Sequence, residues 1–247
     1  MFMLDEKKVM GMEIKGVIDL SYVDWDGKIS SVFFLPYCNF RCPFCHNAAL
    51  VLNPEEGEAT PFEQAEAYLK KRRSWIDGVC ITGGEPTLHN DLPQLCLRLK
   101  KRGFLTKIDT NGTNPLMVKG LIEKGLVDYI AMDIKAPLTV KNYSKAIGVN
   151  AEKFLGKVKE TAKVLLESEI DYEFRTTVVP TLHEKKDIEE ICHSIKGCKK
   201  YVLQKFDISL GKETLDPNFS ELKPFTDEEM NTFLVIAKHF IPNTRLR

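Results

Sequence analysis

Apolar and polar positions along this chain alternate between short strand-like runs and longer helical stripes. The apolar runs of six segments predict strands, and stretches with apolar residues three or four positions apart predict helices between them. In 151–168, for example, Phe154, Val158, Ala162 and Leu165 fall on one helical stripe. We expect strands at 31–37, 77–82, 104–109, 127–134, 171–179 and 199–206, and helices at 61–73, 90–102, 115–124, 151–168 and 184–196.

Alternating strands and helices indicate βαβ units and therefore a parallel sheet. Six such units are too few for the complete eight-stranded barrel. We therefore expect the α/β class and a partial, open (β/α)6 TIM-like barrel over residues 12–206. Thr60 and Thr226, each with a Glu three positions later, are the predicted helix starts at 61 and 227.

The two ends of the chain differ from this pattern. Residues 1–11 are expected to form a disordered extension. Residues 207–247 are expected to pack on the barrel as a loop to 224, an amphipathic helix over 226–240 and a short tail over 243–247.

The charge balance and the absence of long apolar runs exclude some classes of protein and of partner. The 247 residues contain 35 Lys+Arg and 35 Asp+Glu, so net charge favours neither a nucleic-acid nor an anionic-membrane partner. Apolar runs are too short to span a bilayer, and the first residues do not resemble a signal peptide. We therefore expect a cytoplasmic protein without a nucleic-acid or membrane partner. Seven cysteines without a regular framework argue against a disulfide scaffold.

Three of the cysteines carry the strongest chemical signal. Cys38, Cys42 and Cys45 form a C-x3-C-x2-C loop directly after a predicted strand. Four-iron clusters are normally held by four thiolates, so three ligands would leave one iron open to a substrate or cofactor. A zinc site would need His46 as fourth ligand, outside the usual zinc spacings. Unrelated core cysteines are the other alternative.

The other cysteines have simpler interpretations. Cys80 lies in an apolar strand and Cys96 on a helical face, which favours core packing. Cys192 and Cys198 lie near each other in sequence, but a second cluster would need closer pairs and a further ligand. We expect one cluster.

Three further polar motifs follow predicted strands. They are Thr-Gly-Gly-Glu-Pro at 82–86, Ile-Asp-Thr-Asn-Gly at 108–112 and Ala-Met-Asp-Ile-Lys at 131–135. Open α/β sheets bind ligands beyond the carboxyl ends of their strands. We therefore expect one site that unites these motifs with the cysteine loop.

The cysteine spacing, with Phe44 before the last cysteine, resembles the radical S-adenosylmethionine (SAM) superfamily. The order of the four motifs resembles the activases of glycyl radical enzymes, and most closely the longer activating proteins of anaerobic ribonucleoside-triphosphate reductase. The resemblance runs from about Met12 to Gln204. It implies a partial barrel, one [4Fe-4S] cluster, SAM, and a flavodoxin- or ferredoxin-type electron donor.

The resemblance also implies roles for individual residues. Cys38, Cys42 and Cys45 would be the cluster ligands, and Phe44 would lie against the adenine. The other SAM contacts would be Gly83, Gly84 and Glu85 at the methionine amino group, and Asn111. Asp109, Thr110 and Asp133 would hold a monovalent cation near the SAM carboxylate.

Each of these roles has a structural alternative. The two glycines could form an ordinary strand-end turn, and Asp109, Thr110 and Asn111 could serve as caps and turn formers. Lys135 lies on the same strand face as Asp133, so it could pair with Asp133 or contact the SAM carboxylate.

Arg175 lies mid-strand, where a charge is rarely buried without a partner. We expect it to face the barrel interior and to contact SAM or the substrate backbone as a catalytic residue. An ion pair with Glu173 is the alternative. The resemblance gives no role for Gln204.

Two departures from the activase pattern bear on which protein is the partner. In Asp24-Trp25-Asp26-Gly27-Lys28, Asp26 replaces the usual Pro, and Tyr37 replaces the Gly before the first cysteine. We expect both at the mouth of the site.

The predicted function is abstraction of a glycine α-hydrogen from a glycyl radical enzyme, with anaerobic ribonucleoside-triphosphate reductase as partner. The alternatives are a radical SAM enzyme for a small molecule or peptide, whose pocket residues 207–247 could build, and an iron–sulfur electron-transfer or regulatory protein.

Overall fold

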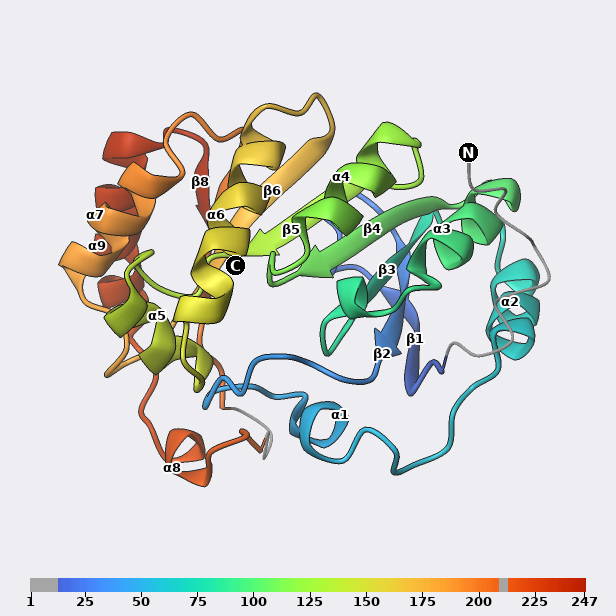
Figure 1. Cartoon of the computed structure of the whole chain (residues 1–247), viewed down its shortest axis with the longest axis horizontal. Helices are drawn as coiled ribbons and strands as arrows, with labels where there is room; N and C mark the ends of the chain where they lie inside the picture. The colour runs from blue at the N-terminus through green and yellow to red at the C-terminus, as the bar shows by residue number, and fades with distance from the viewer. Residues whose placement is uncertain (1–12, 209–212) are drawn as a thin grey trace. The chain divides into compact units, whose positions relative to one another are not determined.

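The structure is a computed structural model that describes residues 13–208 and 213–247 (Figure 1). The extension predicted over residues 1–11 lies outside the described residues. The chain divides into two compact units. Unit 1 comprises the chain up to Cys38, Ala49–Thr110 and Leu116–Ile130, whereas unit 2 comprises Asn39–Ala48, Asn111–Pro115 and Ala131–Arg247.

The strands are hydrogen-bonded in chain order from β1 to β8. β1 pairs antiparallel with β2, whereas the β2–β3, β3–β4, β6–β7 and β7–β8 pairs are parallel. The strands are β1 (Gly16–Ser21), β2 (Ser30–Leu35), β3 (Gly78–Gly83), β4 (Leu105–Thr110), β5 (Tyr129–Asp133), β6 (Asp171–Val178), β7 (Tyr201–Lys205) and β8 (Thr244–Leu246).

Helices separate the parallel strands, as the alternating pattern predicts. The five helices expected between strands correspond to α2, α3, α4, α6 and α7, and the helix expected at 226–240 is α9. The pattern missed α1, α5 and α8. The helices are α1 (Ala48–Leu52), α2 (Phe62–Lys71), α3 (Leu92–Lys101), α4 (Pro115–Glu123), α5 (Val140–Ile147), α6 (Glu152–Leu166), α7 (Lys185–Ser194), α8 (Pro217–Ser220) and α9 (Asp227–Phe240).

The predicted fold class, α/β with a partial TIM-like barrel, is confirmed. Strands β2–β7 correspond to the six predicted strands, and β1 and β8 extend the sheet at its two ends. The tail expected over 243–247 is wrong, because β8 pairs in parallel with β7 there. Its three residues are too few to show a periodic pattern, so only tertiary pairing identifies them as a strand.

The two predicted helix starts have different outcomes. Thr226 caps α9, since its hydroxyl accepts the Glu229 N–H while the Glu229 carboxylate accepts the Thr226 N–H. Thr60 does not cap α2, whose N-terminal flanking residue is Pro61. Instead, Thr60 donates its backbone N–H to the Ile14 carbonyl at 2.7 Å in an isolated β-bridge.

Each unit has its own buried core. In unit 1, Val79 and Ile81 of β3 and Leu95 of α3 are fully buried. In unit 2, Phe174 of β6 and Tyr201 of β7 are fully buried, and α7 and α9 lie side by side (Figure 1).

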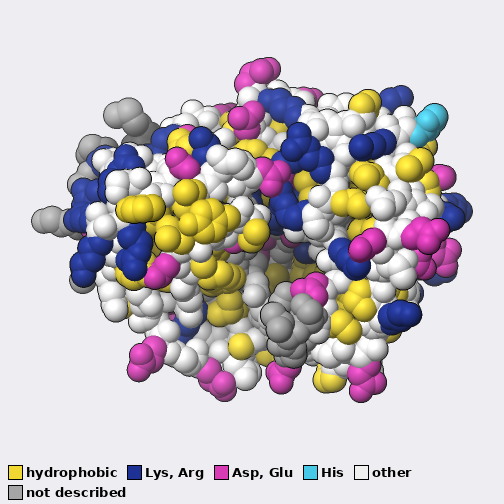
Figure 2. Space-filling model, turned by 180° about the vertical axis from the view of Figure 1, so that it is seen from behind, with side chains coloured by type: hydrophobic (Ala, Val, Ile, Leu, Met, Phe, Trp, Pro, Cys, Tyr) yellow, Lys and Arg dark blue, Asp and Glu magenta, His cyan; other side chains and the backbone are white. Residues whose placement is uncertain are grey.

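The surface agrees with the balanced charge. Figure 2 shows positive, negative and hydrophobic side chains interspersed over one face of the molecule. Among the helices that the structure describes, none combines the length and apolar character needed to cross a membrane.

Candidate active site at the strand ends

The cysteine loop begins directly after β2. Cys42 is buried, Cys38 and Cys45 are partly exposed, and all three are free of disulfides. The Cys45 N–H donates to the Cys42 carbonyl at 3.0 Å, which folds the second half of the loop into a turn. The chain passes from unit 1 to unit 2 between Cys38 and Asn39.

In unit 1, the Gly83–Gly84 pair contacts the backbone before the first cysteine. The Tyr37 carbonyl accepts the Glu85 N–H at 2.8 Å, and a Cβ placed on Gly84 would lie 1.9 Å from the Tyr37 oxygen. No side chain fits there. Tyr37 itself has a positive φ of 65°, a conformation that costs a non-glycine residue about 1–2 kcal/mol. The close approach of the Tyr37 backbone therefore explains why glycine is needed here. Contact of the two glycines with SAM stays a prediction.

In unit 2, a glycine that the sequence did not single out makes the equivalent contact. The Arg41 N–H donates to the Ile147 carbonyl at 2.8 Å at the end of α5. A Cβ on Gly148, the residue that ends α5 with φ of 69°, would lie 1.9 Å from the Arg41 carbonyl oxygen. A glycine just after a helix is a recognisable stop signal, but it does not reveal what the helix end contacts.

Asn111 also stabilises the cysteine loop, through side-chain hydrogen bonds within unit 2. Its amide donates to the Asn39 side-chain oxygen at 2.8 Å, and its own oxygen accepts the Thr113 N–H and hydroxyl at 3.0 and 2.7 Å. Asn39 in turn donates to the Thr113 hydroxyl at 2.8 Å. The turn-forming alternative for Asn111 is therefore present in the structure. Asn39 and Thr113 were not predicted.

Glu85 and Thr110 meet inside unit 1. The Glu85 carboxylate is 1% exposed and accepts the Thr110 hydroxyl at 2.7 Å, the Thr87 hydroxyl at 2.5 Å and the Thr87 N–H at 3.0 Å. The structure thus joins the 82–86 and 108–112 motifs, as their positions at strand ends predict.

Asp109, on the opposite face of β4 from Thr110, has a lysine beside it. The Lys107 ammonium lies 2.9 Å from Asp109 Oδ1. This oxygen is buried. Lys107 is 1% exposed, and it also donates to the Asp24 carbonyl at 2.5 Å. The sequence analysis did not identify Lys107.

Asp133 of β5 has two cationic partners in unit 2. Its Oδ2 lies 2.9 Å from the Lys135 ammonium, and its Oδ1 lies 3.0 Å from Arg175 Nε of β6. Burial lowers the pKa of Lys135, but the nearby Asp133 carboxylate and Cys42 raise it by more, so the net shift is upward. Phe44 is buried, and its ring centroid lies 5.8 Å from the Lys135 ammonium. This brings the loop and the β5 motif together.

Arg175 pairs with Asp133, and Glu173 forms ion pairs with other cations. The Glu173 carboxylate lies 2.8 Å from Lys200 and 3.0 Å from Arg247. Burial raises the pKa of Glu173, but Lys200, Arg247 and Arg175 together hold it below its usual value. Contact of Arg175 with SAM or substrate stays a prediction. Gln204, on β7, is half-buried.

The segment around Trp25 does not lie where we expected it. Trp25 is buried, lies within 2.8 Å of a Cβ placed on Gly78, and packs its ring 5.9 Å from that of Tyr129. Gly78 and Tyr129 are the first residues of β3 and β5. The 24–28 segment of unit 1 is therefore at the amino ends of the strands, so the placement of Asp26 at the mouth of the site is wrong. The reason is that β1 runs antiparallel to β2 and delivers the chain to that end.

The cysteine loop fits an iron–sulfur cluster by its chemistry. Burial raises the pKa of the Cys45 thiol, while an Asn47 backbone hydrogen bond and Lys135 oppose this effect. Thiolate ligation would overcome the rise, since a metal displaces the proton. No three His, Cys, Asp or Glu side chains of the described residues are grouped to hold a single metal ion. A four-iron cluster does not need such a group, because each protein thiolate binds a different iron.

The remaining cysteines behave as core residues. Cys80 and Cys96 are fully buried. Burial raises the pKa of Cys192 and of Cys198 to about 12, so both thiols stay protonated at neutral pH. Their burial, like that of Cys80 and Cys96, agrees with a packing role.

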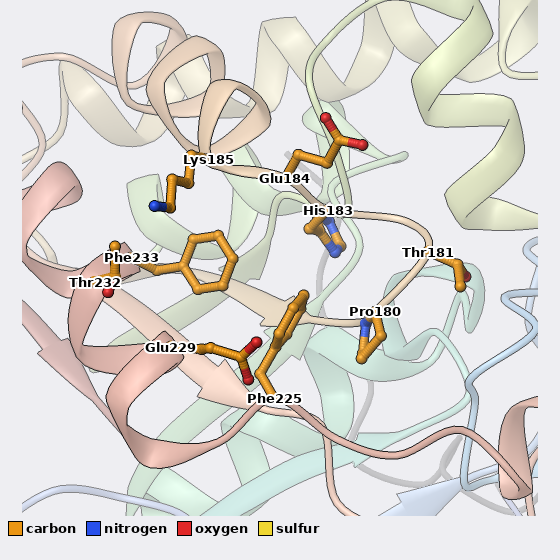
Figure 3. Close-up of a pocket in the computed structure, with 9 residues that line it drawn as sticks. All are labelled: Pro180, Thr181, His183, Glu184, Lys185, Phe225, Glu229, Thr232 and Phe233. Carbon is orange, nitrogen blue, oxygen red and sulfur yellow. The ribbon is translucent and has the colours of Figure 1, made fainter.

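A cavity of about 490 Å³ lies in unit 2 beyond the end of β6. Figure 3 shows the Phe225 and Phe233 rings and the His183 imidazole turned toward the same space. His183 is buried, and its Nε2 forms a hydrogen bond of 2.9 Å with the Lys135 carbonyl. A residue that lines the cavity is therefore hydrogen-bonded to a predicted site residue. The lining residues are Pro180, Thr181, His183, Glu184, Lys185, Phe225, Glu229, Thr232 and Phe233.

Comparison with known proteins identifies the family. The model of the radical SAM superfamily matches residues 32–196, which include the cysteine loop and the three strand-end motifs. The chain belongs to the radical SAM superfamily. It is therefore a radical SAM enzyme, and the superfamily implies a [4Fe-4S] cluster and SAM as cofactors.

Two relatives from Methanocaldococcus jannaschii are similar over most of the chain. Both are described as a "putative glycyl-radical enzyme activating enzyme". One is 32% identical over 95% of this chain and 95% of its own length, and the other is 29% identical over 70% of this chain and 64% of its own.

The fold is also similar to that of a solved structure. Streptococcus suis SuiB bound to S-adenosylmethionine superposes with a TM-score of 0.66 at 18% identity over 87% of this chain. The chain spans about half of SuiB, 51% of its length, so this likeness concerns the fold alone.

Proposed function

We propose that this radical SAM enzyme is an activase that removes a glycine α-hydrogen from a partner glycyl radical enzyme, with anaerobic ribonucleoside-triphosphate reductase as that partner. The observation that carries the proposal is the 32% identity to an activating-enzyme relative over 95% of both chains. Agreement along nearly the whole length favours a shared activity more strongly than agreement of the cluster loop alone, because the loop chemistry is common to the superfamily.

The residues have distinct tasks in this proposal. Cys38, Cys42 and Cys45 would hold the cluster. When reduced by a flavodoxin- or ferredoxin-type donor, the cluster would supply the one electron needed to cleave SAM to methionine and a 5′-deoxyadenosyl group, which would take the hydrogen from the partner. Gly83, Gly84 and Glu85 would bind the SAM amino group, and Phe44 would lie against the adenine. Asp109, Thr110, Asn111, Asp133 and Lys135 complete the SAM site.

Arg175 is proposed to contact SAM or the backbone of the partner's glycine segment. Arg175 Nε donates a hydrogen bond to the Asp133 carboxylate. Because the guanidinium is planar, this bond also fixes the direction of its two terminal nitrogens. We do not include the monovalent cation that the resemblance implies, because Asp109 and Asp133 already have cationic side-chain partners.

The test begins with SAM cleavage without a partner. Anaerobically reconstituted protein, dithionite and SAM should give 5′-deoxyadenosine, measured by chromatography. Cys42→Ala should abolish the product. Cys192→Ala is the matched control, since this core cysteine should be replaceable without loss of product. No SAM binding by protein that carries a full cluster would reject the proposed site.

The partner is tested by electron paramagnetic resonance. With the anaerobic ribonucleotide reductase of the same organism added, the spectrum should show a glycyl doublet that is absent with Cys42→Ala. Cleavage of SAM without a doublet on this reductase would reject the named partner. Cleavage without a doublet on any glycyl radical protein of that organism would reject the activase function.

The second candidate function is modification of a small molecule or short peptide. The observation that favours it is the cavity of about 490 Å³, since four of its lining residues, Phe225, Glu229, Thr232 and Phe233, come from the segment after residue 206. Mass spectrometry of extracts incubated with protein and SAM should then reveal a modified compound, and Phe233→Ala should reduce its yield.

A further inference from the structure

Lys107 is an unusual residue for the interior of a strand. It is 1% exposed, and a buried ammonium is stable only when anionic or carbonyl oxygens surround it. Two oxygens lie beside it, the Asp24 carbonyl at 2.5 Å and Asp109 Oδ1 at 2.9 Å, and the Cys80 sulfur lies at 3.8 Å. The register of β3 and β4 sets Cys80 directly opposite Lys107, so the ammonium is fixed by the sheet itself.

The same ammonium neutralises a carboxylate that a free cation would otherwise have to neutralise. Asp109 is only 13% exposed, and its Oδ1 is buried. A buried carboxylate of this kind needs a compensating positive charge. The Lys107 ammonium at 2.9 Å supplies that charge from two residues earlier on the same strand.

Asp133 follows the same principle in unit 2. Its two oxygens lie 2.9 and 3.0 Å from Lys135 and Arg175. Asp133 is therefore neutralised by side chains of unit 2, as Asp109 is by Lys107 in unit 1.

We infer that Lys107 is a positioning residue that replaces a monovalent cation, so that this enzyme binds SAM without potassium or sodium. The ammonium keeps the Asp109 carboxylate from repelling the SAM carboxylate and holds it in one orientation. The inference requires SAM to bind at these strand ends, as proposed above, and it does not depend on the identity of the protein partner.

The experiment measures SAM affinity on the cluster-loaded protein, anaerobically and without a reductant. The dissociation constant is compared in potassium, sodium and choline chloride at equal ionic strength. For the wild-type protein we expect values within about twofold in the three salts, a difference below 0.5 kcal/mol. Binding that is more than tenfold tighter in potassium or sodium than in choline would overturn the inference.

Lys107→Met is the decisive variant, because it keeps a long side chain and removes the charge. In choline it should bind SAM about tenfold or more weakly, the effect of losing one charge-assisted contact. Potassium or sodium should restore most of that loss, which a merely structural role for Lys107 would not produce. Equal affinity of Lys107→Met and wild type in every salt would refute the inference.

Controls separate charge from folding. Lys107→Arg should stay insensitive to the salt, and Lys107→Met combined with Asp109→Asn should lose the response to potassium. Lys100→Met removes an ammonium that pairs with Asp128 at 2.8 Å on the surface of the same unit, and it should leave SAM affinity unchanged. If Lys107→Met fails to hold its cluster, the melting temperature of the apoprotein is measured in the three salts instead of the affinity for SAM. Potassium should then raise the melting temperature of the variant relative to choline, and it should leave that of the wild type unchanged. A variant melting temperature equal in all salts would count against the inference.

Discussion

The predicted site residues of unit 1 and those of unit 2 are held by different kinds of interaction. In unit 1, Glu85 accepts hydrogen bonds from uncharged donors of Thr87 and Thr110, and Lys107 forms an ion pair with Asp109. In unit 2, Asp133 is enclosed by Lys135 and Arg175. In each unit, a glycine without a side chain allows close backbone contact with the cysteine loop or the residue before it: Gly84 in unit 1 and Gly148 in unit 2.

This difference determines how each part should respond to change. Hydroxyl and amide donors can rearrange when a carboxylate is altered, whereas two cations left without their shared anion cannot. Unit 2 should therefore be more sensitive to loss of a charge and to acid.

The largest effect is expected at Gly84 and Gly148, the two glycines that pack against the backbone of the cysteine loop and of Tyr37 before it. Gly148→Ala combines a left-handed backbone with a Cβ that would lie 1.9 Å from the Arg41 oxygen, so it should cost about 2–5 kcal/mol of unfolding free energy. Gly84→Ala has only the steric clash with Tyr37 and should cost about 1–3 kcal/mol. Urea unfolding and the iron content after reconstitution measure both.

Gly156→Ala is the matched control for these variants. Gly156 lies within α6 with open space around it, so alanine should stabilise the protein by about 0.5–1 kcal/mol. If Gly148→Ala were equally harmless, the contact between α5 and the loop would not hold the loop in place.

The next largest effect should come from the carboxylates. Asp133→Asn leaves the Lys135 and Arg175 cations without an anion between them and should cost about 3 kcal/mol in urea unfolding of the apoprotein. Glu85→Gln keeps an acceptor for the Thr87 and Thr110 donors and should cost about 1 kcal/mol. Equal costs would show that the two parts of the site do not differ as described.

The smallest effect should be a dependence on pH centred on His183. Its Nδ1 accepts the Val179 N–H at 3.0 Å, so Nε2 carries the proton that binds the Lys135 carbonyl and the ring is neutral. Burial lowers the pKa of His183 below 6.5, although hydrogen bonds to Lys135 and Val179 oppose the shift.

The direction of that dependence follows from proton uptake. Below about pH 6.5 the unfolded chain binds a proton that the folded chain does not, so the unfolding free energy falls as pH falls, by at most about 1.4 kcal/mol per pH unit. His183→Gln keeps a donor and an acceptor and should remove this slope between pH 7.5 and 5.5, above the range in which carboxylates titrate. A slope unchanged in the variant would assign the effect to another group.

The sequence by itself determined the parallel α/β order, the cysteine loop and the strand-end motifs. Strand and helix periodicity are local properties, and the carboxyl ends of parallel strands always meet at one edge, so the joining of Glu85 with Thr110 could be predicted. The resemblance carried by Cys38, Cys42, Cys45 and the later motifs agreed with the family match.

Only the tertiary structure decided which partner each polar group takes. The pairing of Arg175 with Asp133, the contact of Gly148 with Arg41, the strand β8 and the place of Trp25 at the amino ends of the strands all depend on residues far apart in sequence. Lys107 shows this most clearly. In the sequence it is one lysine in a short strand, and only the sheet register and the path of the chain after β1 enclose its ammonium between Asp24, Cys80 and Asp109, because desolvation makes a buried charge depend on every neighbour it has.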